Sequence, residues 1–284
     1  MGILSGLESF GLGKLSETKV YDEDKKTDQN GQQAEEEKEK HVVSEDELLF
    51  DKSFSCPICA SSFKCKMVRT GKVKLQGADL DLRPKYETVD VLKYDAIVCP
   101  KCGYAALNRY YNYITAGQAR MVKEQISINF KGLPAYGSAY TYEDAINRHK
   151  LSLISTIVKR AHSSERAYNC LKLAWLYRGM AESLSKDDAE YQEKVAACKK
   201  EEKELIQNAY EGFVHAFSTE GFPMCGMDQH TMEYLIASLA MQCGKYEDAV
   251  RMVSRIIVSR DANERTKEKA RVLKEKLVDA QKGI

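Results

Sequence analysis

Two short cysteine motifs are the part of this sequence best suited to chemistry. Each has the form Cys-Pro-x-Cys; the first supplies Cys56 and Cys59, and the second supplies Cys99 and Cys102. Such a segment makes a tight turn that points both sulfurs at one centre, and two turns complete a tetrahedron around Zn(II). We therefore predict a zinc site with these four cysteines as ligands. Because protein sulfurs fill all four positions, the site is expected to be structural rather than catalytic.

The segment between the two motifs is longer than usual. It holds 39 residues, from Ala60 to Val98, against the roughly 15 to 20 of the common double-pair pattern. A β insertion accounts for the excess, because closing a longer loop adds little entropy cost. The runs Lys72–Leu75 and Val91–Val98 have the composition of short strands within it.

The residue after each motif must turn the chain. Gly103 follows the second motif, at a position where a left-handed backbone is often needed. Ala60 stands at the same place after the first motif, and there it is expected to carry about 1 kcal/mol of local strain.

The remaining cysteines allow a second interpretation of the chemistry. Cys65 could replace a ligand or be redox-active, although a core or surface thiol is the simpler interpretation. A thioredoxin-like exchange role for either C-x-x-C is the rival hypothesis, but that chemistry normally uses one pair at a helix N-terminus on a βαβ frame. The other four cysteines are isolated and typical of small buried hydrophobic residues: Cys170, Cys198, Cys225 and Cys243.

Changes in composition divide the chain into four segments. Residues 1–15 are a short apolar segment, either a docking peptide or a loose tail, and residues 16–51 have the composition of an acidic disordered linker. Residues 52–112 are the expected zinc-ribbon-like module, and residues 113–284 the expected helical domain. Between Val20 and Glu47 there are 11 acidic residues and 4 lysines, so the net charge of +1 conceals a basic remainder.

From Thr115 onward the pattern is helical, with roughly seven helices expected before the C-terminus. Thr141 followed by Asp144, and Asp261 followed by Glu264, have the spacing of N-terminal helix caps. The charged stretch from Asp187 to Glu204 is expected to extend a helix.

One short sequence occurs twice in the helical part. Tyr142-Glu-Asp-Ala recurs at Tyr246, an offset of 104 residues, close to three units of the roughly 34-residue tetratricopeptide period. Gly244 and Lys245 are expected to make a turn between two helices. The predicted fold class is therefore mainly α, a tetratricopeptide-like helical hairpin domain with a small N-terminal β zinc-ribbon-like module. Trp175 is expected in its core rather than in a binding groove.

The composition argues against several functional classes. Hydrophobic residues make up 43% and charged residues 30%, which is typical of a globular protein with a real core. The sequence has no run of about 18 apolar residues, so no membrane-spanning helix is expected. Because the N-terminus also has no export signal, we expect a cytoplasmic location. The sequence contains no phosphate-binding glycine loop and no nucleophile elbow, so we expect no catalytic residue.

Three stretches of sequence resemble one known family. They are Phe54 to Cys59, Tyr94 to Ala106, and Leu173 to Arg178, and together they are similar to the bacterial domain-of-unknown-function 2225 family, DUF2225. The resemblance runs from about Phe54 to the C-terminus, and the opening MGILSGLESFGLGKL is similar to the start of some longer members. It implies a cytoplasmic bacterial protein with a zinc-ribbon-like segment and tetratricopeptide-like helices, and it implies no activity. Such sequences commonly have Gly where this chain has Ala60.

Three functional hypotheses follow. The leading one is an interaction scaffold, stabilised by structural zinc, that binds a protein or peptide partner. The second is nucleic-acid binding, because residues 52–109 carry 11 Lys or Arg against 5 Asp or Glu, and Tyr104, Tyr110 and Tyr111 could stack on bases. The third is a thiol redox protein. The sequence predicts no oligomeric state.

Overall fold

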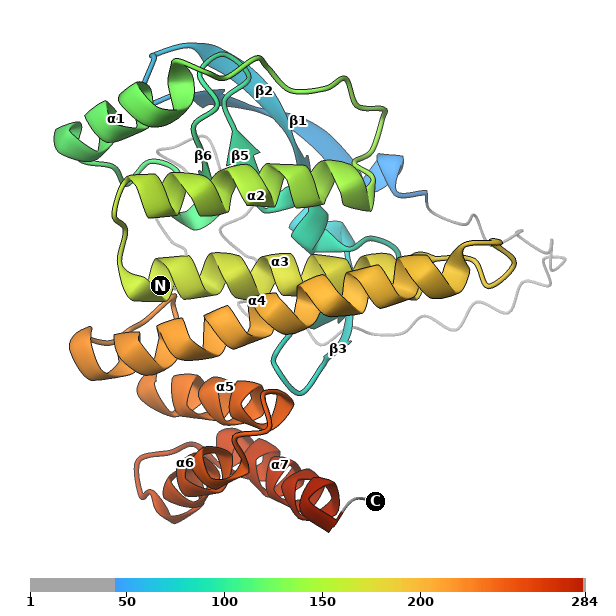
Figure 1. Ribbon diagram of the computed structural model, residues 1–284, viewed down its shortest axis with the longest axis vertical. Helices are drawn as coiled ribbons and strands as arrows, with labels where there is room; N and C mark the ends of the chain where they lie inside the picture. The colour runs from blue at the N-terminus through green and yellow to red at the C-terminus, as the bar shows by residue number, and fades with distance from the viewer. Residues whose placement is uncertain (1–43, 283–284) are drawn as a thin grey trace, which may run out of the picture. The chain divides into compact units, whose positions relative to one another are not determined.

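The computed structural model describes residues 44–282 (Figure 1). The expectations for residues 1–15, and for most of residues 16–51, therefore lie outside the described part of the chain. The described residues belong to one compact unit. Leu49 to Asp51, which end the segment expected as a linker, form the start of the first strand.

Three antiparallel hairpins make up the β region, each with two strands. The strands are β1 (Leu49–Ser55) with β2 (Ser62–Val68), β3 (Leu75–Ala78) with β4 (Pro84–Tyr86), and β5 (Ala96–Val98) with β6 (Ala105–Leu107). The first hairpin pairs Leu49 with Val68 and Ser55 with Ser62, so its turn holds the first cysteine motif. The third hairpin holds the second motif in the same way. The hairpin β3–β4 lies between them, where a β insertion was predicted.

The prediction of two strands in the insertion is only partly confirmed. A 3₁₀ turn, Thr70–Lys72, precedes β3, which begins at Leu75. The run from Val91 starts with a second 3₁₀ turn, Val91–Tyr94, because the Asp90 side chain caps it by accepting a 3.0 Å hydrogen bond from the Leu92 amide. Only Ala96–Val98 is extended. A local side-chain bond thus replaces strand pairing at the start of this run.

Seven α-helices lie within residues 44–282, as predicted. They are α1 (Ala116–Val122), α2 (Tyr142–Val158), α3 (Ser163–Ser183), α4 (Tyr191–Thr219), α5 (Gln229–Gln242), α6 (Tyr246–Val258) and α7 (Glu264–Lys282). A π-helical turn, Lys123–Ser127, continues α1. The charged stretch expected to extend a helix lies in α4 from Tyr191 onward.

One of the two predicted caps is confirmed and the other is wrong. Thr141 and Asp144 form a capping box at the start of α2. At α7, Asn263 is the capping residue, since its Oδ1 accepts a 2.8 Å hydrogen bond from the Thr266 amide. Asp261 lies too far from the helix, because a cap must directly precede the first helical residue.

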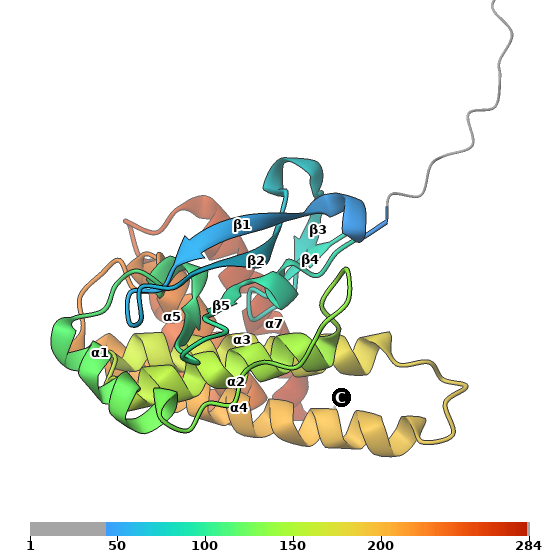
Figure 2. The same ribbon diagram turned by 90° about the horizontal axis from the view of Figure 1, so that it is seen from above.

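The helices pack one after another behind the β region. Helix α2 contacts β5 and β6 on one side and α3 on the other, and α3 lies along α4 (Figures 1 and 2). Helices α5, α6 and α7 continue the series. Trp175 of α3 is 4% exposed and belongs to the core that these helices share, as expected. The β region has a separate cluster around the cysteines.

Both copies of the Tyr-Glu-Asp-Ala sequence begin a helix. They open α2 and α6, and their alanines, Ala145 and Ala249, are completely buried. Gly244, with φ of +72°, makes the predicted turn between α5 and α6. The small alanines let neighbouring helices approach closely. Assignment of these hairpins to the tetratricopeptide class stays a prediction.

Candidate metal centre

The two cysteine turns have the same backbone construction. In the first, the Cys56 amide donates to Ser61 O (2.9 Å) and the Ala60 amide donates to Cys56 O (2.9 Å). In the second, the Cys99 amide donates to Tyr104 O (2.9 Å) and the Gly103 amide donates to Cys99 O (3.0 Å). Each motif therefore forms the turn that joins two paired strands, and this turn places both cysteine sulfurs on the same side.

The residue that completes each turn has a left-handed backbone, as the sequence predicted. The φ angle is +57° at Ala60 and +74° at Gly103. Glycine adopts this conformation freely, whereas the Cβ of alanine opposes it. The backbone of the first turn is therefore strained at Ala60.

The four predicted ligands meet at one point. All their sulfur atoms lie within 4.8 Å of one another. The Sγ atoms of Cys56 and Cys102 are 3.6 Å apart, as are those of Cys59 and Cys99. A tetrahedral ion with Zn–S bonds of about 2.3 Å requires S···S separations of about 3.8 Å. The cluster therefore fits a tetrahedral thiolate-bound metal ion.

Burial and mutual contact set the ionisation of these thiols. The hydrogen bond from Cys102 lowers the pKa of Cys56 to about 4, and the same bond raises the pKa of Cys102. Burial raises the pKa of Cys99. Without a metal, Cys56 is thus the cysteine that favours the thiolate form. Binding of a metal ion requires the other three thiols to lose their protons.

Hydrogen-bond donors surround the sulfurs. The Ile58 amide donates to Cys56 Sγ (3.4 Å), and Ser61 Oγ lies 2.9 Å from Cys59 Sγ and 3.4 Å from Cys99 Sγ. The buried hydroxyl of Tyr111 has no hydrogen-bond partner of its own among residues 44–282. Burial, followed by the negative charge of Cys56, raises the pKa of Tyr111. The Ile58 amide and the Ser61 hydroxyl would stabilise the net charge of −2 on a divalent ion held by four thiolates.

Comparison with known proteins identifies the family. The chain matches the family model described as an uncharacterized protein conserved in bacteria, DUF2225, over residues 49–277. This range includes both cysteine turns and six complete helices. The chain belongs to the DUF2225 family. Comparison with curated proteins and with solved structures found no match.

Cys65 of this DUF2225 chain is not part of the sulfur cluster. Its side chain is buried, and its sulfur accepts a 3.0 Å hydrogen bond from the Arg148 guanidinium. The Tyr140 hydroxyl lies 3.6 Å away, and the Tyr140 ring covers the same guanidinium at 4.4 Å. Cys65 therefore lies in the packed core, as the simpler interpretation expected.

The redox hypothesis requires a different local structure. In this DUF2225 protein both C-x-x-C segments lie in hairpin turns, after β1 and β5, and neither opens a helix. Because the dipole and free amides of a helix N-terminus normally activate an exchange thiol, this placement favours metal binding over thiol exchange.

The stacking residues of the nucleic-acid hypothesis are mostly inaccessible. Tyr104 and Tyr111 are 0% and 1% exposed. They pack on each other with ring centroids 5.1 Å apart, beside the cysteine cluster. Tyr110 is partly exposed but lines a pocket on the helical side. Two of the three tyrosines are thus core residues of the DUF2225 β region.

Sequence reasoning missed two hydroxyl-bearing residues beside the cluster. Ser61 follows Cys59 by two residues, and Tyr111 lies nine residues beyond Cys102. Their proximity to the motifs was the only available signal, because a hydroxyl has no ligand spacing to recognise.

No helix in the described residues of this DUF2225 chain combines the length and apolar character needed to cross a lipid bilayer.

Proposed function

We propose that this chain is a protein-interaction scaffold whose β region is held in shape by one structural Zn(II) bound to Cys56, Cys59, Cys99 and Cys102. The convergence of the four sulfurs, with both cross-pairs at 3.6 Å, carries the proposal. Zinc supplies tetrahedral cross-linking here, with no free position for a substrate.

Linking the two hairpins explains why the fold would need a metal. The hairpin β1–β2 is separated from β5–β6 by the whole insertion, and small hairpins are only marginally stable alone. The hairpin β5–β6 rests on α2, where the Ala105 amide donates a 3.3 Å hydrogen bond to Ser155 Oγ. A metal shared by both turns would thus add a link between β1–β2 and the helices to the one that Cys65 makes with Arg148.

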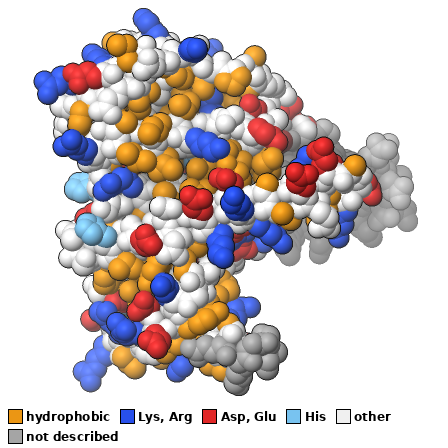
Figure 3. Space-filling view, in the orientation of Figure 1, with side chains coloured by type: hydrophobic (Ala, Val, Ile, Leu, Met, Phe, Trp, Pro, Cys, Tyr) orange, Lys and Arg blue, Asp and Glu red, His pale blue; other side chains and the backbone are white. Residues whose placement is uncertain are grey.

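Exposed apolar side chains support a partner surface. Tyr113 and Ile128 are each 76% exposed, and Ile154 and Ile157 on α2 are 42% and 48% exposed. Figure 3 shows hydrophobic side chains spread over the face that carries α1 and α2. Apolar patches of this kind commonly mark interaction sites.

The test compares three proteins. They are the wild type, the double variant Cys99→Ser/Cys102→Ser and the control Cys243→Ser, which changes a partly buried cysteine far from the cluster. We expect about one zinc per chain in the wild type and the control, and none in the double variant. Hydrogen exchange should show lost protection in β1, β2, β5 and β6 of the double variant.

The interaction role is tested on the same proteins by proximity labelling in cells. Partners labelled by the wild type and the control should be lost from the double variant. Reduced, folded wild-type protein without zinc would contradict the metal assignment. Zinc-loaded protein that labels nothing above background would contradict the scaffold role.

A further inference from the structure

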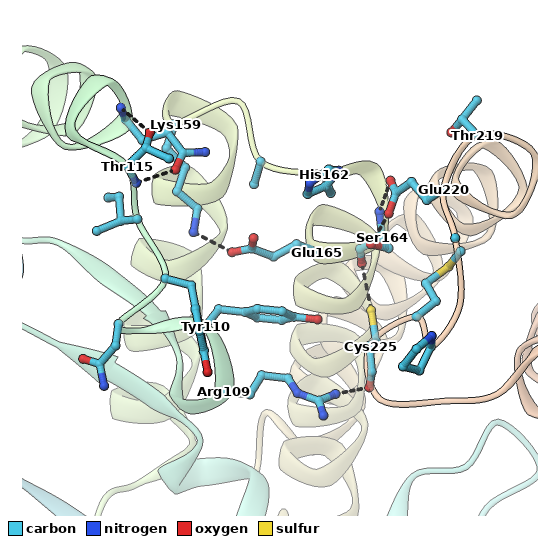
Figure 4. A pocket seen from close by; sticks show the side chains of 18 residues that line it. Arg109, Tyr110, Thr115, Lys159, His162, Ser164, Glu165, Thr219, Glu220 and Cys225 are labelled. Carbon is cyan, nitrogen blue, oxygen red and sulfur yellow. Dashed lines mark hydrogen bonds and ion pairs between the residues drawn. The ribbon is translucent and has the colours of Figure 1, made fainter.

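A pocket of about 990 Å³ opens between three segments that are far apart in the sequence. They are the stretch after β6, the turn between α2 and α3, and the loop between α4 and α5 (Figure 4). Its volume is at the upper end of the roughly 300 to 1,000 Å³ typical of ligand sites. It is separate from the sulfur cluster, since none of the four metal-ligand cysteines lines it.

The charged groups of this pocket already have partners within the chain. Lys159 Nζ is 2.7 Å from Glu165 Oε1, and these side chains are only 2% and 12% exposed. The Glu220 carboxylate accepts hydrogen bonds from the Ser164 amide (3.1 Å) and hydroxyl (2.5 Å). It thereby occupies the N-terminus of α3, where an external anion would otherwise bind.

The fourth charged group is also engaged. The Arg109 guanidinium donates to Cys225 O and lies over the rings of Tyr110 and Tyr168, at 5.7 and 5.9 Å from their centroids. The two cations of the pocket, Arg109 and Lys159, therefore balance the charge of its two anions, Glu165 and Glu220. A phosphate-rich ligand such as a nucleotide would meet the carboxylates of Glu165 and Glu220 as well as the two cations, which argues for an uncharged ligand.

Apolar and amide groups remain available to a ligand. The Tyr110 ring extends across the pocket toward Cys225 in Figure 4. Tyr113 is 76% exposed beside it, and the exposed Pro223 forms part of the opposite lining. The exposed side-chain amide of Asn112 can both donate and accept hydrogen bonds, as a peptide backbone requires.

We infer that this pocket binds a short uncharged segment of a partner protein, with an apolar side chain held beside Tyr110 and Tyr113. The inference rests on the proposed scaffold function and names the chemistry of its partner. Exposed aromatic residues next to a preformed pocket are the groups that most often dominate binding energy at protein interfaces.

The test begins with a phage-displayed library of short random peptides selected on the zinc-loaded full chain. Selected peptides are synthesised and titrated by calorimetry against the wild type, Tyr113→Ala, Asn112→Arg and the control Val258→Ala. We expect the peptides to share an aromatic or aliphatic position and to carry no net charge. Tyr113→Ala should weaken binding about tenfold, and Asn112→Arg should also weaken it. Val258→Ala should not, because Val258 is similarly exposed, at 78%, but lies outside the pocket.

The alternative outcomes separate this inference from the function on which it rests. Peptides that bind Tyr113→Ala and Asn112→Arg as tightly as the wild type would overturn the pocket assignment and leave a scaffold role elsewhere on the surface. Selection of highly charged peptides, or of none, would also overturn it. Zinc-free protein that still binds the peptides through Tyr113 would support the pocket and contradict the structural role of zinc.

Discussion

His149 shows how far the role of one residue depends on its surroundings. Its side chain is completely buried, its Nδ1 lies 2.9 Å from Ala145 O, and its Nε2 has no hydrogen-bond partner among the described residues. Burial lowers its pKa to about 4, although Asp95 acts in the opposite direction. The sequence contains five histidines without a motif, and nothing in it marks His149 as a buried residue. The cysteines, in contrast, were predictable because ligand spacing is a local property.

The lowered pKa of His149 predicts a pH dependence of stability. The unfolded chain takes up a proton at this histidine near its ordinary pKa of 6.5, whereas the folded chain does so only near 4. Unfolding therefore binds a proton between these values, and the free energy of unfolding should fall as the pH drops from about 6.5 to 4, by up to about 3 kcal/mol. Above that window the contribution is fully present.

Urea unfolding followed by circular dichroism across this pH range, with excess zinc, measures the effect. His149→Gln should give a shallower pH dependence than the wild type, whereas His215→Gln on the exposed face of α4 should keep the wild-type slope. Equal slopes for all three proteins would show that His149 does not titrate on unfolding. Any release of a cysteine-bound metal ion in acid would affect all three proteins alike.

The cysteine turns are the elements that the sequence described best. Their closure, their left-handed residues and the β insertion between them all follow from local spacing. The extent of the strands was less predictable, because Asp90 caps a 3₁₀ turn in a run that otherwise has strand composition. The cap of α7 was misplaced for a similar reason, since Asp261 and Asn263 are both capping types and only the start of the helix decides between them.

The two turns predict opposite effects for exchanging their left-handed residues. Ala60→Gly should raise the free energy of unfolding by about 0.5 to 1 kcal/mol, because relief of strain exceeds the added entropy of the unfolded chain. Gly103→Ala should lower it by about 1 to 2 kcal/mol. At Gly103 a Cβ would also lie 2.6 Å from ring atoms of Phe130, which would have to move.

Chemical denaturation of zinc-loaded protein gives both values, and zinc content shows whether each turn still binds. Ala78→Gly in β3, away from the turns, is the control for adding a glycine to the β region. A stabilising effect of Gly103→Ala would contradict the left-handed assignment of the second turn.

At the scale of the whole molecule, Arg178 connects the β insertion to three helices. From α3 its guanidinium contacts Asp79 (3.1 Å) and Asp81 (2.7 Å) of the insertion, Glu202 of α4 (2.6 Å) and Gln242 of α5 (3.2 Å). Arg178 and Asp81 are 97 residues apart in the chain. Contacts over such separations leave no periodic signal, so the sequence revealed the elements but not their attachment.

Arg178→Lys should lower the free energy of unfolding by about 2 kcal/mol, because a point charge cannot replace the planar fork and leaves the buried Asp81 poorly paired. The control Arg271→Lys changes an exposed arginine that pairs with Glu264 and Glu268 within α7, and its stability should change little. Denaturant unfolding provides the values. Equal stabilities of the two variants would show that the Arg178 contacts do not hold the insertion in place.

The position of Trp175 has a practical consequence for spectroscopy. It is the only tryptophan in 284 residues, and it lies in the shared helical core, with an indole N–H that has no hydrogen-bond partner among residues 44–282. Emission excited selectively at the indole therefore reports only on α3 and its neighbours. Its spectrum should shift to longer wavelength when the helices open, while loss of order confined to the cysteine turns would leave it unchanged.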